Sequence, residues 1–373
     1  ELAESWPAAD LVVTSYDLLR RDETLYEGQE FYACILDEAQ AIKNHTTQKY
    51  KAVCKVRSRV RFALTGTPVE NRLGELWSIF SFLMPGYLPP YKSFCSRFEK
   101  PIVQEEDQTA VRRLNQLTGP FILRRMKSDV LKELPPKTEN VYRIELEEEQ
   151  RKLYLAAVVD AREKLQAAKP EDKMAVFAVL MRLREICCDP RLIADNWEGG
   201  SAKLDACVEL VSSAVEGGHR ILLFSQFTSM LELLAKRLDA EGISHFTLQG
   251  STPKPVRAEL VRRFNGGEVS VFLISLRAGG TGLNLTAADI VIHYDPWWNV
   301  AAQNQATDRA YRIGQQNPVQ VYKLIAQDTI EEKIVELQQA KQSLADTVTG
   351  TADGAILSMR PDELLQLLEG SEP

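Results

Sequence analysis

The sequence contains no apolar run close to the roughly 18 residues that are needed to span a bilayer. Its first residues, ELAESWPAAD, also lack the basic and then apolar pattern of a secretory signal. We therefore expect a soluble, intracellular protein with no membrane partner. An initiating Met is missing too, and the chain starts within a patterned segment, which predicts that it is a piece of a longer protein.

Cysteine and histidine are few and scattered. The six Cys include no C-x-x-C pair and the four His lie far apart, so neither a zinc site nor a disulfide framework is predicted. Lys and Arg together number 45 against 52 Asp and Glu, which gives a formal net charge of -7. Any contact with nucleic acid must then come from local basic groups rather than from the overall charge.

Length and composition describe an ordinary globular chain. With 373 residues, of which 45% are hydrophobic and 26% charged, two or three domains are expected. Short runs rich in Val, Ile and Leu that end in polar or Gly-rich turns predict strands buried on both faces, as in a parallel sheet. These runs lie at 11–15, 33–38, 60–67, 220–225, 270–275, 289–294 and 319–325.

Apolar residues at helical spacing predict a helix over 71–84, which Pro85 and Gly86 end. Longer helical stretches over 148–168 and 173–188 indicate a helical insertion between two α/β regions. A last clear helix is expected to begin near Thr329, whose side chain is a plausible N-cap, and a short helix is expected near 361–368.

The densest chemical signal is the acidic pair Asp37-Glu38, which is followed by Gln40 where an apolar strand ends. Ligands of open α/β sheets collect outside the carboxyl ends of the strands, so this pair is well placed for Mg²⁺ and a nucleophilic water. Taken alone, an acidic pair is more often a solvated turn.

A second strand end carries Thr65-Gly66-Thr67, whose hydroxyls suit a relay between a nucleotide site and a more distant one. A plain turn and helix cap explains these residues equally well. The glycines at 279, 280 and 282 follow Ser275, and they allow the backbone to approach a phosphate closely. A tight turn without a ligand is the alternative for them.

The fourth signal is the set Gln305, Asp308, Arg309 and Arg312. On a helix these residues share one face, and two guanidiniums aimed together fit a polyphosphate. The alternative is an exposed, salt-bridged helix face.

Taken together, these motifs resemble the SWI/SNF family of DNA-translocating ATPases, within helicase superfamily two. The resemblance covers residues 11–345 and rests on six stretches: ILDEAQAIKN (35–44), ALTGTPVENRLGELWSIFSFLMPG (63–86), FILRRMKSDVLKELPPK (121–137), LLFSQFTSMLELL (222–234), LISLRAGGTGLNLTAADIVIHYDPWWN (273–299) and QATDRAYRIGQ (305–315).

The family resemblance implies ATP and Mg²⁺ as cofactors. Asp37 would be the metal ligand and Glu38 the general base for the attacking water. Arg309 and Arg312 would be arginine fingers, and Gln305 would help to close the cleft. The residues that would contact ATP or couple its hydrolysis to DNA are Gln40, Thr65, Gly66, Thr67, Gly280 and Gly282.

The resemblance also implies double-stranded DNA as a partner, held through its backbone, and a DNA-bound protein as a further target. The residues expected on the DNA are Thr14, Ser15, Gln249, Gly250, Ser251, Ser275 and Trp297. For one residue of the Trp297-Trp298 pair, a place in the core is at least as well supported.

The implied fold is α/β, with two RecA-like parallel-sheet lobes, helical insertions between them and a C-terminal brace helix. The first lobe is expected to be incomplete, since no Gly-Lys-Ser/Thr phosphate loop occurs in the sequence. The expected parts are the end of the first lobe with the start of the insertion (1–135), the helical insertion or linker (136–200), the second lobe (201–327) and the brace helix with the tail (328–373).

The predicted function is the catalytic region of an ATP-dependent translocase or nucleoprotein remodeller on double-stranded DNA. Because the phosphate loop is missing, the chain alone is expected to hydrolyse ATP poorly or not at all. The alternatives are a DNA-binding or partner-binding module without turnover, and a strand-separating helicase. Gln40, where many relatives have His, and the absence of nuclear-type basic runs favour a bacterial, cytoplasmic protein over a nuclear one.

Overall fold

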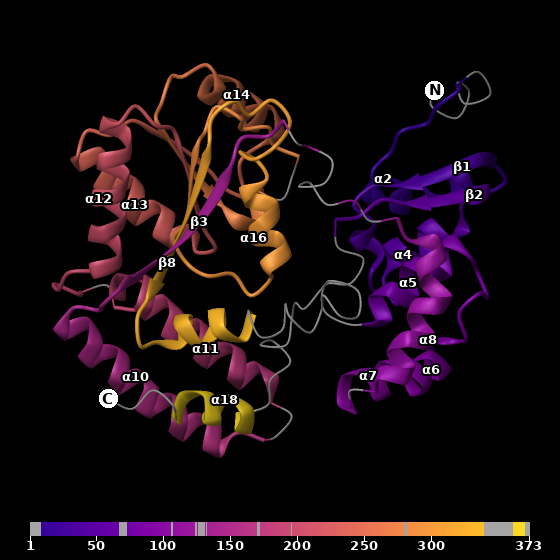
Figure 1. Cartoon of the computed structure of the whole chain (residues 1–373), viewed down its shortest axis with the longest axis horizontal. Coiled ribbons are helices and arrows are strands. Elements are labelled where there is room, and N and C mark those ends of the chain that lie inside the picture. Colours follow the sequence, from indigo (N-terminus) through magenta and orange to yellow (C-terminus); the bar gives the residue numbers. More distant parts are fainter. Residues whose placement is uncertain are drawn as a thin grey trace. The chain divides into compact units, whose positions relative to one another are not determined.

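A computed structural model gives the fold of the chain. It describes residues 9–66, 73–105, 107–123, 125, 131, 133–169, 172–194, 196–279, 282–338 and 361–369. These residues form two compact units that divide near residue 124, and each unit is described by itself (Figure 1). Both units combine helices with a parallel sheet, which confirms the predicted α/β class.

The first unit is built around strands β1 (Glu30–Leu36) and β2 (Arg57–Ala63), which pair in parallel with Ile35 opposite Phe62. Helices pack on one face of this pair and bury Leu36 with neighbouring apolar side chains. The helical segments of the unit are α2 (Tyr16–Arg21), α3 (Glu23–Tyr26), the 3₁₀ turn Ala39–Ile42, α4 (Gln48–Lys55), α5 (Leu73–Leu83), α6 (Tyr91–Phe94), the π turn Cys95–Glu99, α7 (Lys100–Gln104), α8 (Gln108–Thr118) and the 3₁₀ turn Gly119–Phe121.

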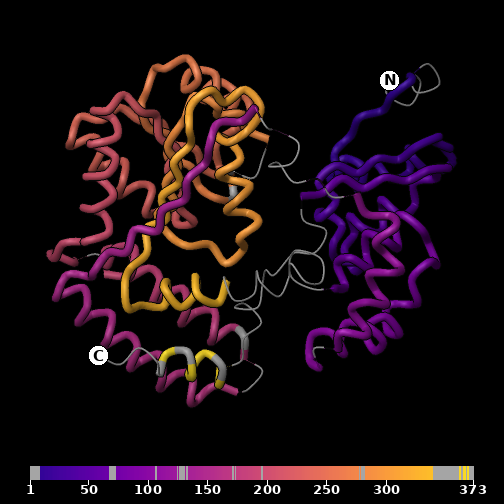
Figure 2. Tube along the Cα trace, viewed as in Figure 1, coloured from indigo at the N-terminus to yellow at the C-terminus, as the bar shows by residue number. Residues whose placement is uncertain are grey.

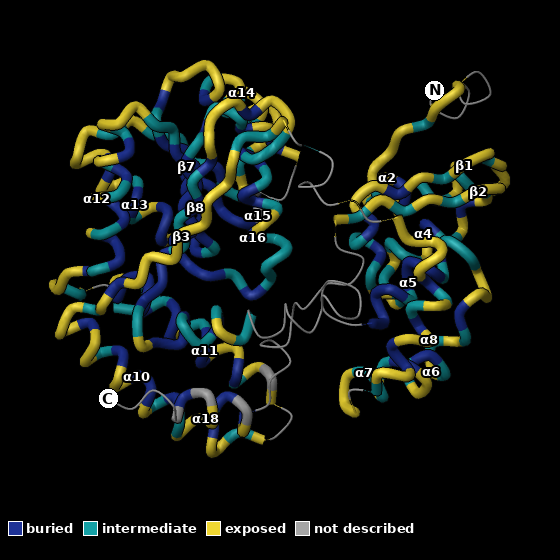
Figure 3. Tube along the Cα trace, in the orientation of Figure 1, coloured by how far each residue is buried: buried dark blue, intermediate teal, exposed yellow. Residues whose placement is uncertain are grey.

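Both strands lie where the sequence predicts them, but the prediction that they are buried on two faces is wrong. Ile35 is 60% exposed and Phe62 is 52% exposed. Within the described residues the sheet has two strands, and nothing covers its second face. Figure 3 shows the consequence, since much of β1 and β2 is drawn as exposed.

The expected strand at 11–15 is also wrong, because these residues form irregular, extended chain. Leu11 and Val13 are 77% and 84% exposed. A β-branched run becomes a strand only when a neighbouring strand pairs with it, and residues 11–15 have no such neighbour in the described sheet.

Helix α5 confirms the prediction for 71–84, although residues 71 and 72 lie outside the described part of the chain. One face of α5 buries Leu76 and Phe80 against Phe94 of α6 and Leu114 of α8. Gly86 follows the helix with a φ of 82°, a left-handed conformation that glycine adopts without steric cost.

The second unit contains a six-stranded parallel sheet, with strands in the order β3-β8-β7-β4-β6-β5 within the described residues. Four of these strands lie where the sequence predicts them. They are β4 (Ile221–Ser225), β6 (Val271–Ser275), β7 (Ile290–His293) and β8 (Val319–Ala326), and nearly all of their residues are buried.

Alternate side chains of each strand enter two separate cores. Leu223 points into the core beneath α12 (Ala202–Glu216) and α13 (Thr228–Ala240). Leu222 points into the opposite core, beneath α14 (Lys254–Asn265) and α16 (Val300–Thr307). The sheet is therefore covered on both faces, as the apolar strand sequences predict.

Two strands of this sheet were not predicted, β3 (Lys137–Ile144) and β5 (His245–Leu248). Strand β3 lies at the sheet edge beside β8, so residues 137–144 are not part of a helical insertion. Glu139 on β3 bonds to Lys323 of β8 and to Lys137. Although its partial burial favours the neutral acid, these two ammonium groups lower the pKa of Glu139 to about 2.

A third core in the second unit is formed mainly by helices. Helices α10 (Glu148–Ala167) and α11 (Lys173–Cys188) confirm the predicted long helical stretches, and they pack with helix 330–338 and α18 (Pro361–Glu369). Figure 2 shows the yellow α18 beside the magenta α10. The short 3₁₀ turn Pro190–Leu192 and α15 (Leu276–Gly279) complete the described elements.

Helix 330–338 begins as predicted. The Thr329 hydroxyl oxygen accepts a hydrogen bond from the Glu331 backbone N–H at 3.2 Å, which makes Thr329 the cap of the first turn. The rest of the expected brace and tail, residues 339–360 and 370–373, lies outside the described chain. None of the described helices has the length and apolarity that crossing a membrane requires.

Candidate functional site

The acidic pair lies in a strained turn directly after β1. Glu38 has φ 50° and ψ 52°, a left-handed conformation that is uncommon for a residue with a side chain. The Glu38 N–H donates to Asp37 Oδ1 at 3.0 Å. Both residues are exposed, and the Tyr16 hydroxyl donates to the backbone oxygen of Asp37 at 2.7 Å. The turn therefore presents two carboxylates at the carboxyl end of a strand.

The structure brings the first two sequence signals together. Leu64, which follows β2, accepts from the Ala39 N–H at 2.9 Å, so the two strand ends stay side by side. Gln40 Nε2 donates to Glu38 Oε2 at 2.5 Å, and Gln40 Oε1 accepts from the Thr65 hydroxyl at 2.9 Å. One amide thus links a carboxylate after β1 with a hydroxyl after β2.

Gly66 and Tyr16 are neighbours of this cluster. Gly66 is described and exposed, whereas the predicted Thr67 lies outside the described residues. Tyr16 was missed by the sequence reasoning, because no motif marks it. Burial and the nearby acids Asp37 and Glu38 raise the pKa of Tyr16 to about 12, so its hydroxyl keeps its proton.

Thr14 and Ser15, which we expect on the DNA, precede α2 instead of ending a strand. The Ser15 hydroxyl oxygen accepts from the Leu18 N–H at 3.3 Å and so caps this helix. Both residues are exposed. Their place at the start of a helix leaves the DNA prediction untested.

The carboxyl ends of the strands in the second unit carry a further group of predicted residues. Ser275 ends β6 and is only 3% exposed, and within the described part of the chain its hydroxyl has no hydrogen-bond partner. Gly282 adopts a φ of 44° after the glycine turn, while Gly280 lies outside the described residues. Gln249, Gly250 and Ser251 form the turn after β5.

The expectation that Gln305, Arg309 and Arg312 share one helix face is wrong. Helix α16 ends at Thr307, so Gln305 lies on it and both arginines lie beyond it. Tertiary hydrogen bonds explain the break. Leu285 N–H donates to Arg309 O at 3.0 Å, and Arg312 Nη1 donates to the oxygen of Leu283 at 3.3 Å.

These bonds tie the arginine turn to the segment that follows the glycines. Arg309 is only 7% exposed and Arg312 is half-buried. Gly314 has a φ of 103° and lets the chain reverse after the arginines. The backbone of Arg309 and the guanidinium of Arg312 are thus tied to residues 283–285, which follow the glycines.

The side chain of His293 contacts the last residue of α16. His293 of β7 lies 2.9 Å from the Thr307 hydroxyl through Nε2, and its ring stacks on Phe224 with centroids 5.6 Å apart. Its Nδ1 is buried and has no hydrogen-bond partner among the described residues. Burial lowers the pKa of His293 to about 3, so the imidazole is neutral.

Trp297 and Trp298 differ in burial and pack in different cores. Trp298 is 7% exposed and belongs to the helical core, where the Arg184 guanidinium lies 4.2 Å from the centre of its ring. This confirms a core position for one tryptophan of the pair. Trp297 is only partly buried, and its backbone N–H donates to Gln303 Oε1 of α16 at 3.3 Å.

Arg184 of α11 was also missed by the sequence reasoning, since a lone arginine on an apolar helix gives no signal. It is fully buried, and it contacts Asp295 Oδ2 at 3.2 Å and the backbone oxygen of Pro296. Asp295 also accepts from the Ser225 hydroxyl at 2.6 Å. The helical core, the end of β4 and the tryptophan loop therefore share one buried ionic network.

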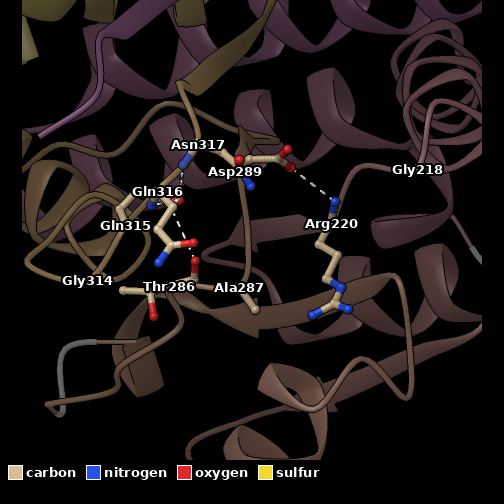
Figure 4. A pocket seen from close by; sticks show the side chains of 9 residues that line it. All are labelled: Gly218, Arg220, Thr286, Ala287, Asp289, Gly314, Gln315, Gln316 and Asn317. Atoms are coloured by element: carbon tan, nitrogen blue, oxygen red, sulfur yellow. Dashed lines mark hydrogen bonds between the residues drawn. The ribbon is translucent and has the colours of Figure 1, made fainter.

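A polar pocket of about 360 Å³ lies elsewhere in the second unit. Arg220, Asp289 and Asn317 line it, and each precedes a strand. Figure 4 shows these side chains around the opening, with Asp289 bonded to Arg220. The pocket is therefore at the edge where strands begin, away from the carboxyl ends that carry the predicted residues.

Two family models match the chain, the SNF2-related domain over residues 4–192 and the helicase conserved C-terminal domain over residues 202–314. The fold and these matches define a protein with two RecA-like lobes. The chain belongs to the SNF2-related family, which confirms the resemblance noted from its motifs.

Similar proteins support the same family assignment. The chain is 40% identical over 365 residues to an uncharacterized ATP-dependent helicase of Mycoplasma pneumoniae, with 96% of this chain and 35% of the relative covered. It is 39% identical over 376 residues to a putative ATP-dependent helicase/translocase of Bacillus subtilis, with 98% and 41% covered. The chain thus spans about a third to two fifths of the length of these relatives.

A solved structure supports the same fold. The SWI2/SNF2 ATPase core of Sulfolobus solfataricus in complex with dsDNA is 35% identical, with a TM-score of 0.55. The match covers 97% of this chain and 78% of that chain.

Proposed function

We propose that this chain is part of the catalytic region of an ATP-dependent translocase that moves along double-stranded DNA and displaces or remodels bound protein. The observation that carries the proposal is the linked cluster in which Gln40 joins Glu38 to Thr65. The matched relatives are named as ATP-dependent helicases, which supports ATP as the substrate. The solved neighbour was determined with dsDNA, which supports a duplex as the track.

The acidic turn fits Mg²⁺. Asp37 and Glu38 offer exposed carboxylate oxygens, and Mg²⁺ in nucleotide sites is usually held by one or two carboxylates together with phosphates and water. We assign Asp37 as the residue that would hold the ion. Bound Mg²⁺ would neutralise part of the charge on the phosphate oxygens.

Glu38 is the proposed general base. Its carboxylate accepts a hydrogen bond from Gln40, which fixes its orientation, and exposure leaves it accessible to a water molecule. It would take the proton of the attacking water. Gln40, Thr65, Gly66 and Thr67 would then transmit the state of the nucleotide to the DNA contacts.

Arg309 and Arg312 are the proposed arginine fingers, and they would stabilise charge on the transferred phosphoryl group. Gln305 would assist on the end of α16. The glycine turn with Gly280 and Gly282 would let the backbone approach the phosphates. The hydrogen bonds from the arginine turn to Leu283 and Leu285 support a joint action of these parts.

The proposed DNA contacts use hydroxyls, backbone N–H groups and one indole. They come from Thr14, Ser15, Gln249, Gly250, Ser251, Ser275 and Trp297. Such contacts to phosphate and sugar position a protein on the duplex without reading its sequence. We therefore expect weak sequence preference.

The test is a steady-state ATPase assay of the complete gene product, with and without duplex DNA. Arginine fingers contribute about 10³ to 10⁵ in rate, so Arg312→Ala should nearly abolish hydrolysis, as should Glu38→Gln. Arg262→Ala, an exposed arginine of α14, is the matched control and should keep turnover near that of the wild type. A turnover of Arg312→Ala within about tenfold of the wild type would reject its role.

A binding module without turnover is the second candidate, because the sequence contains no Gly-Lys-Ser/Thr. In that case the chain binds duplex DNA, while no duplex-stimulated hydrolysis occurs in the complete gene product. A strand-displacement assay separates both candidates from a strand-separating helicase. The translocase proposal predicts duplex-stimulated hydrolysis without displacement.

A further inference from the structure

One arginine donates hydrogen bonds to several backbone carbonyl oxygens of the turn after β5. Arg257 lies on α14, and its Nε donates to Thr252 O at 2.7 Å. Its Nη2 donates to Gly250 O at 2.8 Å and lies 3.4 Å from Gln249 O. A planar guanidinium can hold several acceptors in one fixed geometry, which an ammonium group cannot.

The turn is closed by two further bonds. Thr252 N–H donates to Gln249 O at 3.1 Å, and the Thr252 hydroxyl accepts from Gln249 N–H at the same distance. The residues from Gln249 to Thr252 therefore form a β-turn with a defined backbone. Arg257 and this pair of bonds together hold the backbone of the turn in one conformation.

The orientation of the carbonyls fixes the orientation of the amides. In a trans peptide the C=O and the N–H of one unit point in opposite directions. Because the oxygens of Gln249 and Gly250 face Arg257, the N–H groups of Gly250 and Ser251 face away from it. Both residues are exposed, and no atom lies within 4 Å of the Cβ position at Gly250. Two adjacent N–H donors thus face open space.

We propose that Arg257 is a positioning residue that orients the N–H groups of Gly250 and Ser251 toward one phosphate oxygen of the DNA backbone. The inference rests on the proposed binding of duplex DNA and adds to it the residue that shapes this contact. Adjacent backbone N–H groups of this kind are common anion sites. Arg257 itself stays on the carbonyl side and does not touch the phosphate.

The neighbouring cations of α14 serve other partners. Arg262 Nη2 lies 2.6 Å from Glu259, and Arg263 pairs with Glu268. Arg262 has the same charge and the same helix as Arg257 but pairs with an acid of its own helix. It is therefore a matched control for any effect of charge alone.

The test compares Arg257→Lys and Arg257→Ala with Arg262→Ala in the full chain, using a fluorescein-labelled duplex of mixed sequence as the probe. Loosening of the turn should cost the equivalent of at least one of these two hydrogen bonds, and because a hydrogen bond to a charged group is worth about 1.5 kcal/mol or more, affinity should fall about tenfold or more. Arg257→Lys should not restore it. Arg262→Ala should bind within about twofold of the wild type.

The salt dependence separates positioning from direct contact. A cation on a phosphate contributes about 0.9 to the slope of log affinity against log salt, whereas neutral N–H groups release no counterion. Both Arg257 variants should therefore keep the slope of the wild type. A slope reduced by about 0.9 in Arg257→Ala, or an affinity unchanged in both variants, would overturn the proposal.

Amide exchange at Thr252 tests the turn without DNA. Arg257→Lys should speed this exchange about tenfold, because the turn bond loses its support, while Arg262→Ala should not. Unchanged exchange would contradict the positioning role. If the wild type binds no duplex at all, the proposed function fails and the phosphate contact fails with it, while the exchange still reports whether Arg257 holds the turn.

Discussion

The side chain of Gln40 accepts a hydrogen bond from the hydroxyl of Thr65, a residue 25 positions further along the chain, at 2.9 Å. The same amide donates to Glu38. Parallel pairing of β1 and β2 places the two strand ends side by side, so a single side chain can join them. In the proposed ATPase, this amide links the side chain of the catalytic acid to the second strand end.

The first prediction concerns this link. Thr65→Val keeps the shape of the side chain but removes the hydroxyl, so Gln40 loses one partner and Glu38 its fixed orientation. We expect kcat for duplex-stimulated ATP hydrolysis by the complete gene product to fall about tenfold, the worth of one hydrogen bond of about 1.4 kcal/mol. Steady-state assays at saturating ATP and DNA measure it.

Thr46→Val is the control for the first prediction. The Thr46 hydroxyl donates to Asn44 at 2.7 Å in a nearby exposed turn that has no part in the cluster. Its loss should leave kcat unchanged. Full duplex-stimulated turnover in Thr65→Val would show that the link transmits nothing.

Much of the second unit could be predicted from sequence, because its strands are continuous apolar runs. Strands β4 and β6 are buried along their whole length. A short run of consecutive apolar residues does not have the spacing of an amphipathic helix, so it predicts a buried strand. Strand β3, with the sequence KTENVYRI, was missed since seven of its eight residues are exposed at the sheet edge. An edge strand that buries so few side chains shows no hydrophobic pattern in its sequence.

Two errors have tertiary causes. Residues 11–15 have strand propensity, but within the described residues no strand pairs with them, so a prediction from propensity alone was wrong. The arginines beyond α16 have helical spacing to Gln305, yet hydrogen bonds to Leu283 and Leu285 turn the chain away. The hydroxyls of Thr65 and Thr67 suggested a relay, but the link from Thr65 through Gln40 to Glu38 could be identified only from the structure.

The second prediction concerns a buried ion pair. Lys203 of α12 lies 2.5 Å from Glu331 of helix 330–338, and both side chains are fully buried. Burial alone would lower the pKa of Lys203, but Glu331 raises it, so the ammonium stays charged. Glu331→Ala leaves this charge without its partner and should cost about 3 to 5 kcal/mol in the free energy of unfolding.

Urea unfolding followed by circular dichroism measures this loss. Glu336→Ala changes an exposed acid on the same helix and should alter stability by less than about 0.5 kcal/mol. The double variant Lys203→Met with Glu331→Leu should recover most of the loss, because apolar side chains of similar volume replace the pair. If Glu331→Ala were as stable as the wild type, the pair would not be buried in solution.

The third prediction concerns pH. Burial is the main cause that lowers the pKa of His293 to about 3; Lys323 and, less strongly, Lys137 act in the same direction, and Glu139 acts against them. In the unfolded chain the pKa is about 6.5. Between these values the unfolded state binds one proton more than the folded state, so stability is lost as the pH falls below about 6.5.

His293→Phe should remove this contribution. From pH 6.5 to about pH 5 the wild type should lose about 2 kcal/mol more than the variant in urea unfolding, since each pH unit is worth about 1.4 kcal/mol. Phe fits the stacking position on Phe224. Thr307→Val, which removes the hydrogen-bond partner but keeps the imidazole, should retain the pH dependence. Equal slopes in wild type and His293→Phe would mean that the imidazole is solvated.

The last prediction concerns the open face of β1 and β2. Ile35 and Phe62 are direct cross-strand partners and are both more than half exposed. Apolar surface on a short, unpaired sheet favours association between molecules. Phe62→Thr should therefore reduce self-association of the chain in sedimentation experiments, and it should cost less than about 0.5 kcal/mol in stability.

Leu36→Thr provides the contrast, because Leu36 follows Ile35 on the same strand but is 7% exposed on the opposite face. Losing this buried side chain should destabilise the first unit by about 2 kcal/mol or more. The difference between two adjacent residues then reports which face is covered. If Phe62→Thr unfolded the unit as Leu36→Thr does, the open face would be packed in solution, and the exposure of β2 would not describe the free chain.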